Sequence, residues 1–232
     1  MIKRINNMFV NKKLTRDSIK LCLYEIILMI SFTLVCYLIV NTFNIKGALN
    51  GFIWLLKEIL VYIVIIKLFN IKVGNLLKPK AKISTSLLMI LFGIVYLILE
   101  TVVMQLLTNV PNYSFYDYLS IQFGGKGMAG ATLIIYLFIL TVIIAPFLEE
   151  VVYRGYMLGN ILKEYNNPIV PILISSMAFG LIHLSILGSL NGFLFGMVSG
   201  VVYYKWNNVR YNMILHRTIN LITFLILIIN LI

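Results

Sequence analysis

The chain has 232 residues, of which 61% are hydrophobic and only 12% are charged. A soluble domain carries about 25% charged residues, so this composition excludes a soluble globular protein and indicates a multi-pass membrane protein built as one helical bundle. The formal net charge of +11 does not indicate a nucleic-acid partner, because the basic residues lie in short connections between apolar runs and no nucleic-acid-binding motif is present.

Windows of about 20 apolar residues predict an all-α fold with about seven membrane-spanning helices. A basic N-terminal segment precedes the first apolar run, which is longer than that of a signal peptide and lacks a small-residue cleavage site. We therefore expect an uncleaved first helix. The fourth span is expected to continue as an amphipathic helix to about residue 163. The spans are predicted at 21–43, 51–69, 86–108, 131–157, 169–187, 190–205 and 209–231.

The distribution of basic residues predicts the orientation of these spans. Sixteen of the 19 Lys and Arg residues lie in the N-terminal segment or in the regions that join the second to the third, the fourth to the fifth and the sixth to the seventh span. Lys46 and Lys126 lie on the other side, and Lys57 lies within a span. Because basic residues stay in the cytoplasm, we expect a cytoplasmic N-terminus and an external C-terminus. The long external loop 109–130 closes an N-terminal region of three spans, residues 1–130.

Small and sulfur-bearing residues allow two further predictions. Cys22 and Cys36 are 14 residues apart on one predicted helix, or roughly 21 Å, so they cannot form a disulfide with each other. Gly192, Gly196 and Gly200 recur every four residues along the sixth span. This spacing favours close helix packing, and a glycine-lined substrate path is the alternative.

Two glutamates and an arginine lie within an otherwise apolar stretch of the fourth span. Ionisable groups at bilayer depth are costly and usually mark a functional site. Glu150 and Arg154 are four residues apart with the acid first, which favours a helical ion pair. Glu149 points in another direction on the same helix, so we expect it to face a cavity as a proton-accepting carboxylate.

The two histidines of the chain lie on two later helices, His183 one turn after Phe179 and His216 one turn before Asn220. Carboxylate, imidazole and amide groups from three helices can hold a water for attack on a carbonyl, or can bind a divalent metal. His183 lies about 20 Å from the start of its span and His216 about 10 Å, so the rings meet only if the helices are tilted or begin at different depths. Taken alone, His216 is consistent with an interfacial residue and Asn220 with an interhelical hydrogen bond.

Other polar residues in the spans are expected to serve structure. Glu25, Glu58 and Glu100 are interpreted as hydrogen-bonding residues between helices. Lys57 is expected to pair with its neighbour Glu58 or to extend its ammonium group towards water. Tyr153 is interpreted as an interfacial aromatic residue.

Three motifs carry a family resemblance: Glu149-Glu150-Val-Val-Tyr-Arg154, Phe179-Gly-Leu-Ile-His183 and His216-Arg-Thr-Ile-Asn220. In this order on consecutive membrane helices they resemble the CAAX protease and bacteriocin-processing (CPBP) intramembrane endopeptidases, over about residues 130–225. The resemblance implies a helical bundle with a site recessed from the cytoplasmic face, and it makes residues 131–232 a CPBP-like catalytic core.

The resemblance also implies roles for individual residues. Glu149 would activate the water, supported by Glu150 and Arg154. The two histidines and the asparagine would bind either the oxyanion and the water or, together with Glu149, one divalent metal with zinc as the first candidate. The residues assigned to catalysis in this way are Glu149, Glu150, Arg154, His183, His216 and Asn220.

These inferences predict an endopeptidase of the bacterial inner membrane that cleaves peptides or proteins presented at the lipid bilayer. The abundance of Ile, Asn and Lys indicates an AT-biased genome, which favours peptide or bacteriocin maturation, or self-immunity, over prenyl-protein processing. The alternative is a non-catalytic immunity or scaffold protein that binds a toxin or another partner. A proton-coupled transporter is disfavoured because no inverted repeat is visible.

Overall fold

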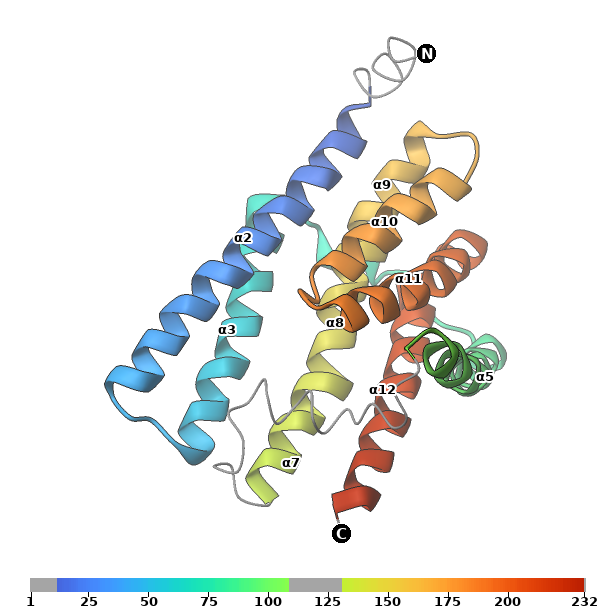
Figure 1. The fold of residues 1–232 in the computed structure, drawn as a ribbon. Helices are drawn as coiled ribbons and strands as arrows, with labels where there is room; N and C mark the ends of the chain where they lie inside the picture. Colours follow the sequence, from blue (N-terminus) through green and yellow to red (C-terminus); the bar gives the residue numbers. More distant parts are fainter. Residues whose placement is uncertain (1–11, 109–130, 232) are drawn as a thin grey trace.

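The structure is a computed structural model, which describes residues 12–108 and 131–231. Within these ranges every regular element is a helix, so the predicted all-helical fold is confirmed (Figure 1). Residues 131–164 form one continuous helix of several segments. The helices are α2 (Lys13–Thr42), α3 (Gly47–Leu68), α4 (Val73–Leu76), α5 (Ile83–Thr108), α7 (Ala131–Leu137), η1 (Phe138–Ile144), α8 (Ala145–Glu149), η2 (Glu150–Leu158), α9 (Gly159–Ile161), η3 (Leu162–Glu164), α10 (Ile169–Leu181), α11 (Ile186–Trp206) and α12 (Val209–Leu231).

Helices occur at all seven predicted positions, but fewer than seven of them meet the requirements for a membrane span. In the described ranges, five helices are long and apolar enough to cross a membrane: Lys13–Thr42, Leu49–Leu68, Ile83–Val103, Ile134–Glu164 and Ile186–Trp206. The fourth span does continue beyond residue 157, as predicted. Among the described residues, the number of candidate membrane spans is therefore slightly lower than the predicted number of about seven.

Helix α10 differs most from the prediction. It has 13 residues and a length of about 20 Å, whereas the hydrocarbon core is about 30 Å thick. The chain turns back at Leu184, which has a left-handed φ of 52°, and α11 then starts at the N-cap Ser185. In Figure 1, α10 runs from the connection after α9 into the middle of the bundle, where this turn lies. The pair α10 and α11 therefore forms a hairpin whose turn lies midway along the bundle, with Leu184 and Ile186 exposed.

The helix 131–164 contains two π-helical segments, η1 and η2. Pro146 has no N–H, so the carbonyl of Thr141 lacks the donor that i→i+5 spacing would supply. The side chain of Asn220 on α12 replaces this donor, because its Nδ2 donates to Thr141 O at 2.7 Å. Glu149 is the last residue of the α-helical segment α8, and Glu150 is the first residue of the π-helical segment η2.

The glycine stripe of α11 packs against α10. A Cβ atom at Gly196 would lie 2.8 Å from Ser176 Cα, and one at Gly200 would lie 2.9 Å from Ile172 Cγ2. A Cβ at Gly192 would lie 2.9 Å from His183 Nδ1. The close helix packing predicted from the glycine spacing is therefore confirmed.

The N-terminal helix α2 is joined to the second half of the chain by buried polar contacts. The Tyr153 hydroxyl donates to Glu25 Oε2 at 2.9 Å, and both side chains are fully buried. The interpretation of Tyr153 as an interfacial residue is therefore wrong, and its partner on α2 explains why. At the start of α2, the Glu164 carboxylate accepts the backbone N–H groups of Leu14 and Thr15 at 2.8 Å each.

One hydrophobic core includes residues from both predicted regions, among them Leu21 and Ile65 from the first and Met157 and Leu215 from the second. The division at residue 130 stays a prediction, and the loop 109–130 lies outside the described residues. Both cysteines are free, as expected.

The predicted pairing of Lys57 with Glu58 is confirmed by an Nζ–Oε1 distance of 2.6 Å. In Figure 1, the start of α2 and the end of α12 lie at opposite ends of the bundle. The cytoplasmic placement of the N-terminus stays a prediction.

Candidate active site

The two adjacent glutamates lie at the junction of α8 and η2 and differ in exposure. Glu150 is fully buried, whereas the Glu149 side chain keeps 15% of its surface exposed. Arg154, four residues after Glu150, is 1% exposed. Its Nε lies 3.2 Å from Glu150 Oε2, so the predicted ion pair is present. The arginine thus compensates the buried carboxylate of Glu150 and leaves Glu149 on a different side of the helix.

Glu150 is surrounded by groups that donate to it. His216 Nδ1 lies 3.0 Å from Oε1, and the Ser199 hydroxyl donates to Oε2 at 3.1 Å. Together with Arg154, these contacts bring η2, α11 and α12 to one carboxylate. Because a carboxylate only accepts, the ring proton of a neutral His216 is on Nδ1.

Glu149 faces the other nitrogen of the same ring. Its Oε2 lies 3.8 Å from His216 Nε2, which is longer than a hydrogen bond. A water beside the line that joins these two atoms can reach both of them. Since His216 Nε2 carries a lone pair in this tautomer, the pair presents two acceptors to such a water.

His183 lies in the turn after α10, and its Nδ1 lies 2.9 Å from the Phe179 carbonyl oxygen. Because a carbonyl only accepts, the ring proton of neutral His183 is also on Nδ1. The ring centroid of Phe179 is 5.1 Å from that of His183 and 6.2 Å from that of His216. Both imidazole rings therefore lie against the ring of Phe179. In Figure 1, α10 begins nearer than α12 to the end of the bundle at which α2 starts.

Aromatic rings enclose the buried cation of the site. The Arg154 guanidinium carbon lies 4.3 Å from the Phe179 ring centroid and 5.2 Å from that of Phe195. The Phe195 ring also lies 4.4 Å, centroid to centroid, from His216. Phe195 therefore packs against two polar side chains of the site, Arg154 and His216.

Asn220 lies one turn beyond His216 on α12, and its amide is used for the bond to Thr141 described above. Among the described residues, its hydrogen bond thus joins two helices, and it does not contact either glutamate. Five of the six predicted site residues lie together in the structure. The sixth, Asn220, lies beside them and donates a hydrogen bond to the Thr141 carbonyl of η1.

The predicted metal site requires several donors around one point. Within residues 12–108 and 131–231, no group of three or more His, Cys, Asp and Glu side chains is gathered closely enough to hold a metal ion. As arranged here, Glu149, His183 and His216 therefore do not form a metal site. The divalent metal stays a prediction, and no step below depends on it.

Three residues of the site were missed by sequence reasoning: Ser199, Asn212 and Phe195. Asn212 had a visible signal, because it precedes His216 by four residues just as Asn220 follows it by four. The spacing places all three on one face of α12. Ser199 and Phe195 are inconspicuous in a glycine-rich helix, and only the fold reveals their contacts.

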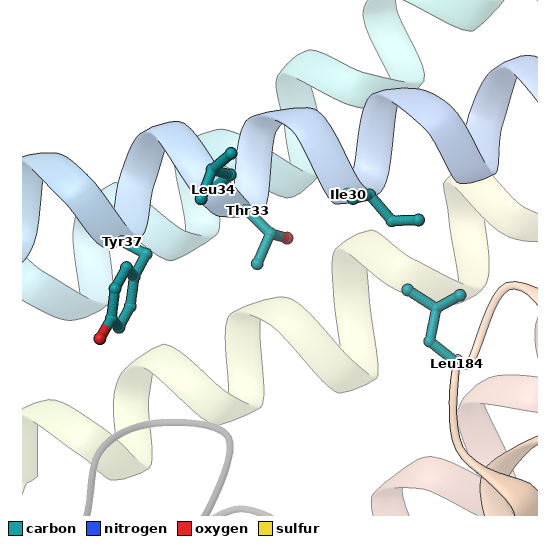
Figure 2. Close-up of a pocket in the computed structure, with 5 residues that line it drawn as sticks. All are labelled: Ile30, Thr33, Leu34, Tyr37 and Leu184. Atoms are coloured by element: carbon teal, nitrogen blue, oxygen red, sulfur yellow. The ribbon is translucent and has the colours of Figure 1, made fainter.

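A pocket of about 320 Å³ lies between α2 and the turn after α10 (Figure 2). It is lined by Ile30, Thr33, Leu34, Tyr37 and Leu184. Leu184 directly follows His183 in the chain, but none of the six predicted site residues lines the pocket. The pocket is therefore apolar and lies next to the polar cluster, but the predicted site residues do not line it.

Comparison with known proteins gives one match. Residues 131–222 match the family model of Type II CAAX prenyl endopeptidase Rce1-like proteins. This segment is Rce1-like. The resemblance predicted from the three motifs is therefore confirmed, and the Rce1-like segment contains all six predicted site residues.

The Rce1-like segment starts at α7 and ends within α12, so α2, α3 and α5 lie outside the match. No curated protein and no solved structure matches the chain. The apolar helices, together with the match of residues 131–222 to a family of membrane proteases, indicate a multi-pass membrane protein.

Proposed function

We propose that this protein is an intramembrane endopeptidase that cleaves peptides or proteins presented at the membrane, with a water activated by Glu149. The observation that carries the proposal is the placement of His216 between two carboxylates. Its Nδ1 lies 3.0 Å from Glu150 and its Nε2 lies 3.8 Å from Glu149. The match of this segment to a protease family supports the same reaction class.

The chemistry follows from the two acceptors that face each other. A water between Glu149 and His216 Nε2 donates one O–H to each, so its lone pairs point away from them towards a substrate carbonyl. Glu149 accepts one water proton as the oxygen attacks the carbonyl carbon. When the C–N bond breaks, the same proton passes to the leaving amine. Glu150 and Arg154 hold the imidazole in the orientation that this step requires.

His183 and Asn220 are proposed to assist at the carbonyl oxygen, on the basis of the family resemblance. The rings of His183 and His216 both lie against the ring of Phe179. Asn220 donates one N–H of its amide to Thr141 O, and the second N–H of the same group can donate to an oxyanion.

The biological role proposed here is peptide or bacteriocin maturation, or self-immunity, in a bacterial inner membrane with the N-terminus in the cytoplasm. The composition of the chain supports it, as argued above. The partners would be a peptide or protein substrate and the lipid bilayer.

The decisive experiment compares the membrane peptidome of cells that express the wild-type chain or Glu149→Gln, by mass spectrometry. Glu100→Gln is the matched control, since Glu100 is another partly buried carboxylate of a membrane helix but does not touch the site. We expect cleavage products to disappear only in Glu149→Gln, at equal protein level. Retention of a self-immunity phenotype in Glu149→Gln would instead favour the non-catalytic immunity or scaffold function. A chelator added to the purified protein tests the predicted metal.

A further inference from the structure

A chain of hydrogen bonds leads from α12 through α11 to Glu150 and back to α12. Asn212 Nδ2 donates to the Ser199 carbonyl oxygen at 2.6 Å and to Ser199 Oγ at 2.8 Å. Ser199 Oγ donates to Glu150 Oε2, and Glu150 Oε1 accepts from His216 Nδ1. Asn212, Ser199 and Glu150 are fully buried, so water does not compete for these bonds.

The direction of each bond in this chain is fixed by the one before it. The Ser199 carbonyl can only accept, so the end of the Asn212 amide that faces it must be the NH₂ group. The second N–H of that group points at Ser199 Oγ and occupies a lone pair of the hydroxyl. The single hydroxyl proton is then directed away from Asn212, towards Glu150.

The same logic extends to the imidazole. Glu150 receives a proton donor at Oε2 from Ser199 and a cation from Arg154, and these hold the carboxylate as an acceptor in one rotamer. Its other oxygen, Oε1, therefore faces His216 Nδ1 as an acceptor. The proton of the neutral ring stays on Nδ1, and the lone pair on Nε2 stays directed towards Glu149.

We infer that Ser199 and Asn212 are positioning residues that set the orientation of Glu150 and, through it, the tautomer and the orientation of His216. Neither residue belongs to the three motifs that carry the family resemblance. The backbone carbonyl of Ser199 fixes the orientation of the Asn212 amide. The hydrogen bonds that follow from it leave the lone pair of the His216 ring on Nε2. For its kinetic part only, the inference rests on the proposed function.

The test uses the full chain in lipid bilayers. Ser199→Ala removes the hydroxyl that donates to Glu150. Ser176→Ala is the matched control, because Ser176 is also buried on a neighbouring helix, but its hydroxyl bonds only to the Ile172 carbonyl one turn earlier. Asn212→Asp is the second variant, because it keeps the size of the side chain but offers the Ser199 proton a competing acceptor.

The first readout does not need activity. With only two histidines in the chain, ¹⁵N-histidine labelling gives two sets of ring resonances, which a His183→Asn variant assigns. We expect wild-type His216 to be protonated at Nδ1 and not at Nε2. Ser199→Ala and Asn212→Asp should mix the two tautomers or broaden these resonances, and Ser176→Ala should leave them unchanged.

The second readout is cleavage of a peptide identified in the peptidome experiment. Loss of an outer partner that orients a metal-bound histidine typically costs about 10- to 100-fold in activity, and we expect the same range for the orientation of His216. We expect this loss in kcat with an unchanged KM for Ser199→Ala, and a partial rescue in Ser199→Cys through its weak S–H donor. Ser176→Ala should keep wild-type kcat.

Two results would overturn the inference. One is a wild-type His216 protonated at Nε2, because the chain of donors would then run the other way. The other is a Ser199→Ala variant whose His216 resonances match those of Ser176→Ala. If no variant and not even the wild type cleaves any peptide, the proposed function fails, while the resonances still decide the positioning role.

Discussion

Replacement of Gly196 by alanine tests the close contact between α10 and α11 on which the position of Phe179 and His183 depends. The added Cβ would lie 2.8 Å from Ser176 Cα and 2.9 Å from Ser176 Cβ. Neither atom is the end of a flexible side chain, so the backbone of α10 must move. Overpacking of this kind costs about 1–3 kcal/mol of the free energy of unfolding.

Gly74→Ala is the matched control, because a Cβ there has nothing within 4 Å. Both substitutions gain the helix preference of alanine over glycine, so that gain cancels in the comparison. For a chain of this size, 1 kcal/mol corresponds to about 2–4 °C in Tm, so Gly196→Ala should melt roughly 2–12 °C below Gly74→Ala.

The assay is thermal unfolding of both variants in the same lipid, together with peptide cleavage at a temperature where both are folded. Phe179 lies three residues after Ser176, so a displaced α10 should also lower kcat in Gly196→Ala. Equal Tm values for the two alanine variants would show that the helices are not held at the distance described here.

Three further predictions concern buried polar contacts. Glu150→Gln leaves the Arg154 cation without its counter-charge and should lower the free energy of unfolding by about 3–5 kcal/mol, as measured by denaturant titration; a loss no greater than that of an exposed pair would contradict it. Tyr153→Phe should cost about 1–3 kcal/mol, and combination with Glu25→Gln in a double-mutant cycle should give a clear coupling energy, whereas strict additivity would refute the contact. Asn220→Asp cannot donate to the π-helical segment and should destabilise the protein by about 1 kcal/mol or more, which a Tm equal to that of the wild type would disprove.

Much of the fold followed from the sequence because membrane helices are long and apolar. The helix positions came from apolar runs, and the Glu150–Arg154 pair came from the spacing of four residues, which is a property of one helix. The glycine stripe of α11 predicted close packing for the same reason. Patterns within one helix were therefore readable.

Contacts between helices were not readable to the same extent. Ser199 meets Glu150 across 49 residues of sequence, and no local pattern encodes that distance. The turn between α10 and α11 was predicted too late in the chain, after residue 187, because its left-handed conformation occurs at Leu184, a residue with no glycine or proline signal. Without that turn, α10 looked like a full span, and the depth at which His183 meets His216 could not be derived.

The contact between Glu25 and Tyr153 has a consequence for biogenesis. Translation must continue for 128 residues after Glu25 before its phenol partner is made. At about 5–20 residues per second, this takes roughly 6–26 s. During that interval the Glu25 carboxyl group lacks the Tyr153 hydroxyl, whereas Tyr62 on α3, which also interacts with Glu25, is made much earlier. The contact between α2 and the helix that also carries Glu149 can therefore form only after this interval.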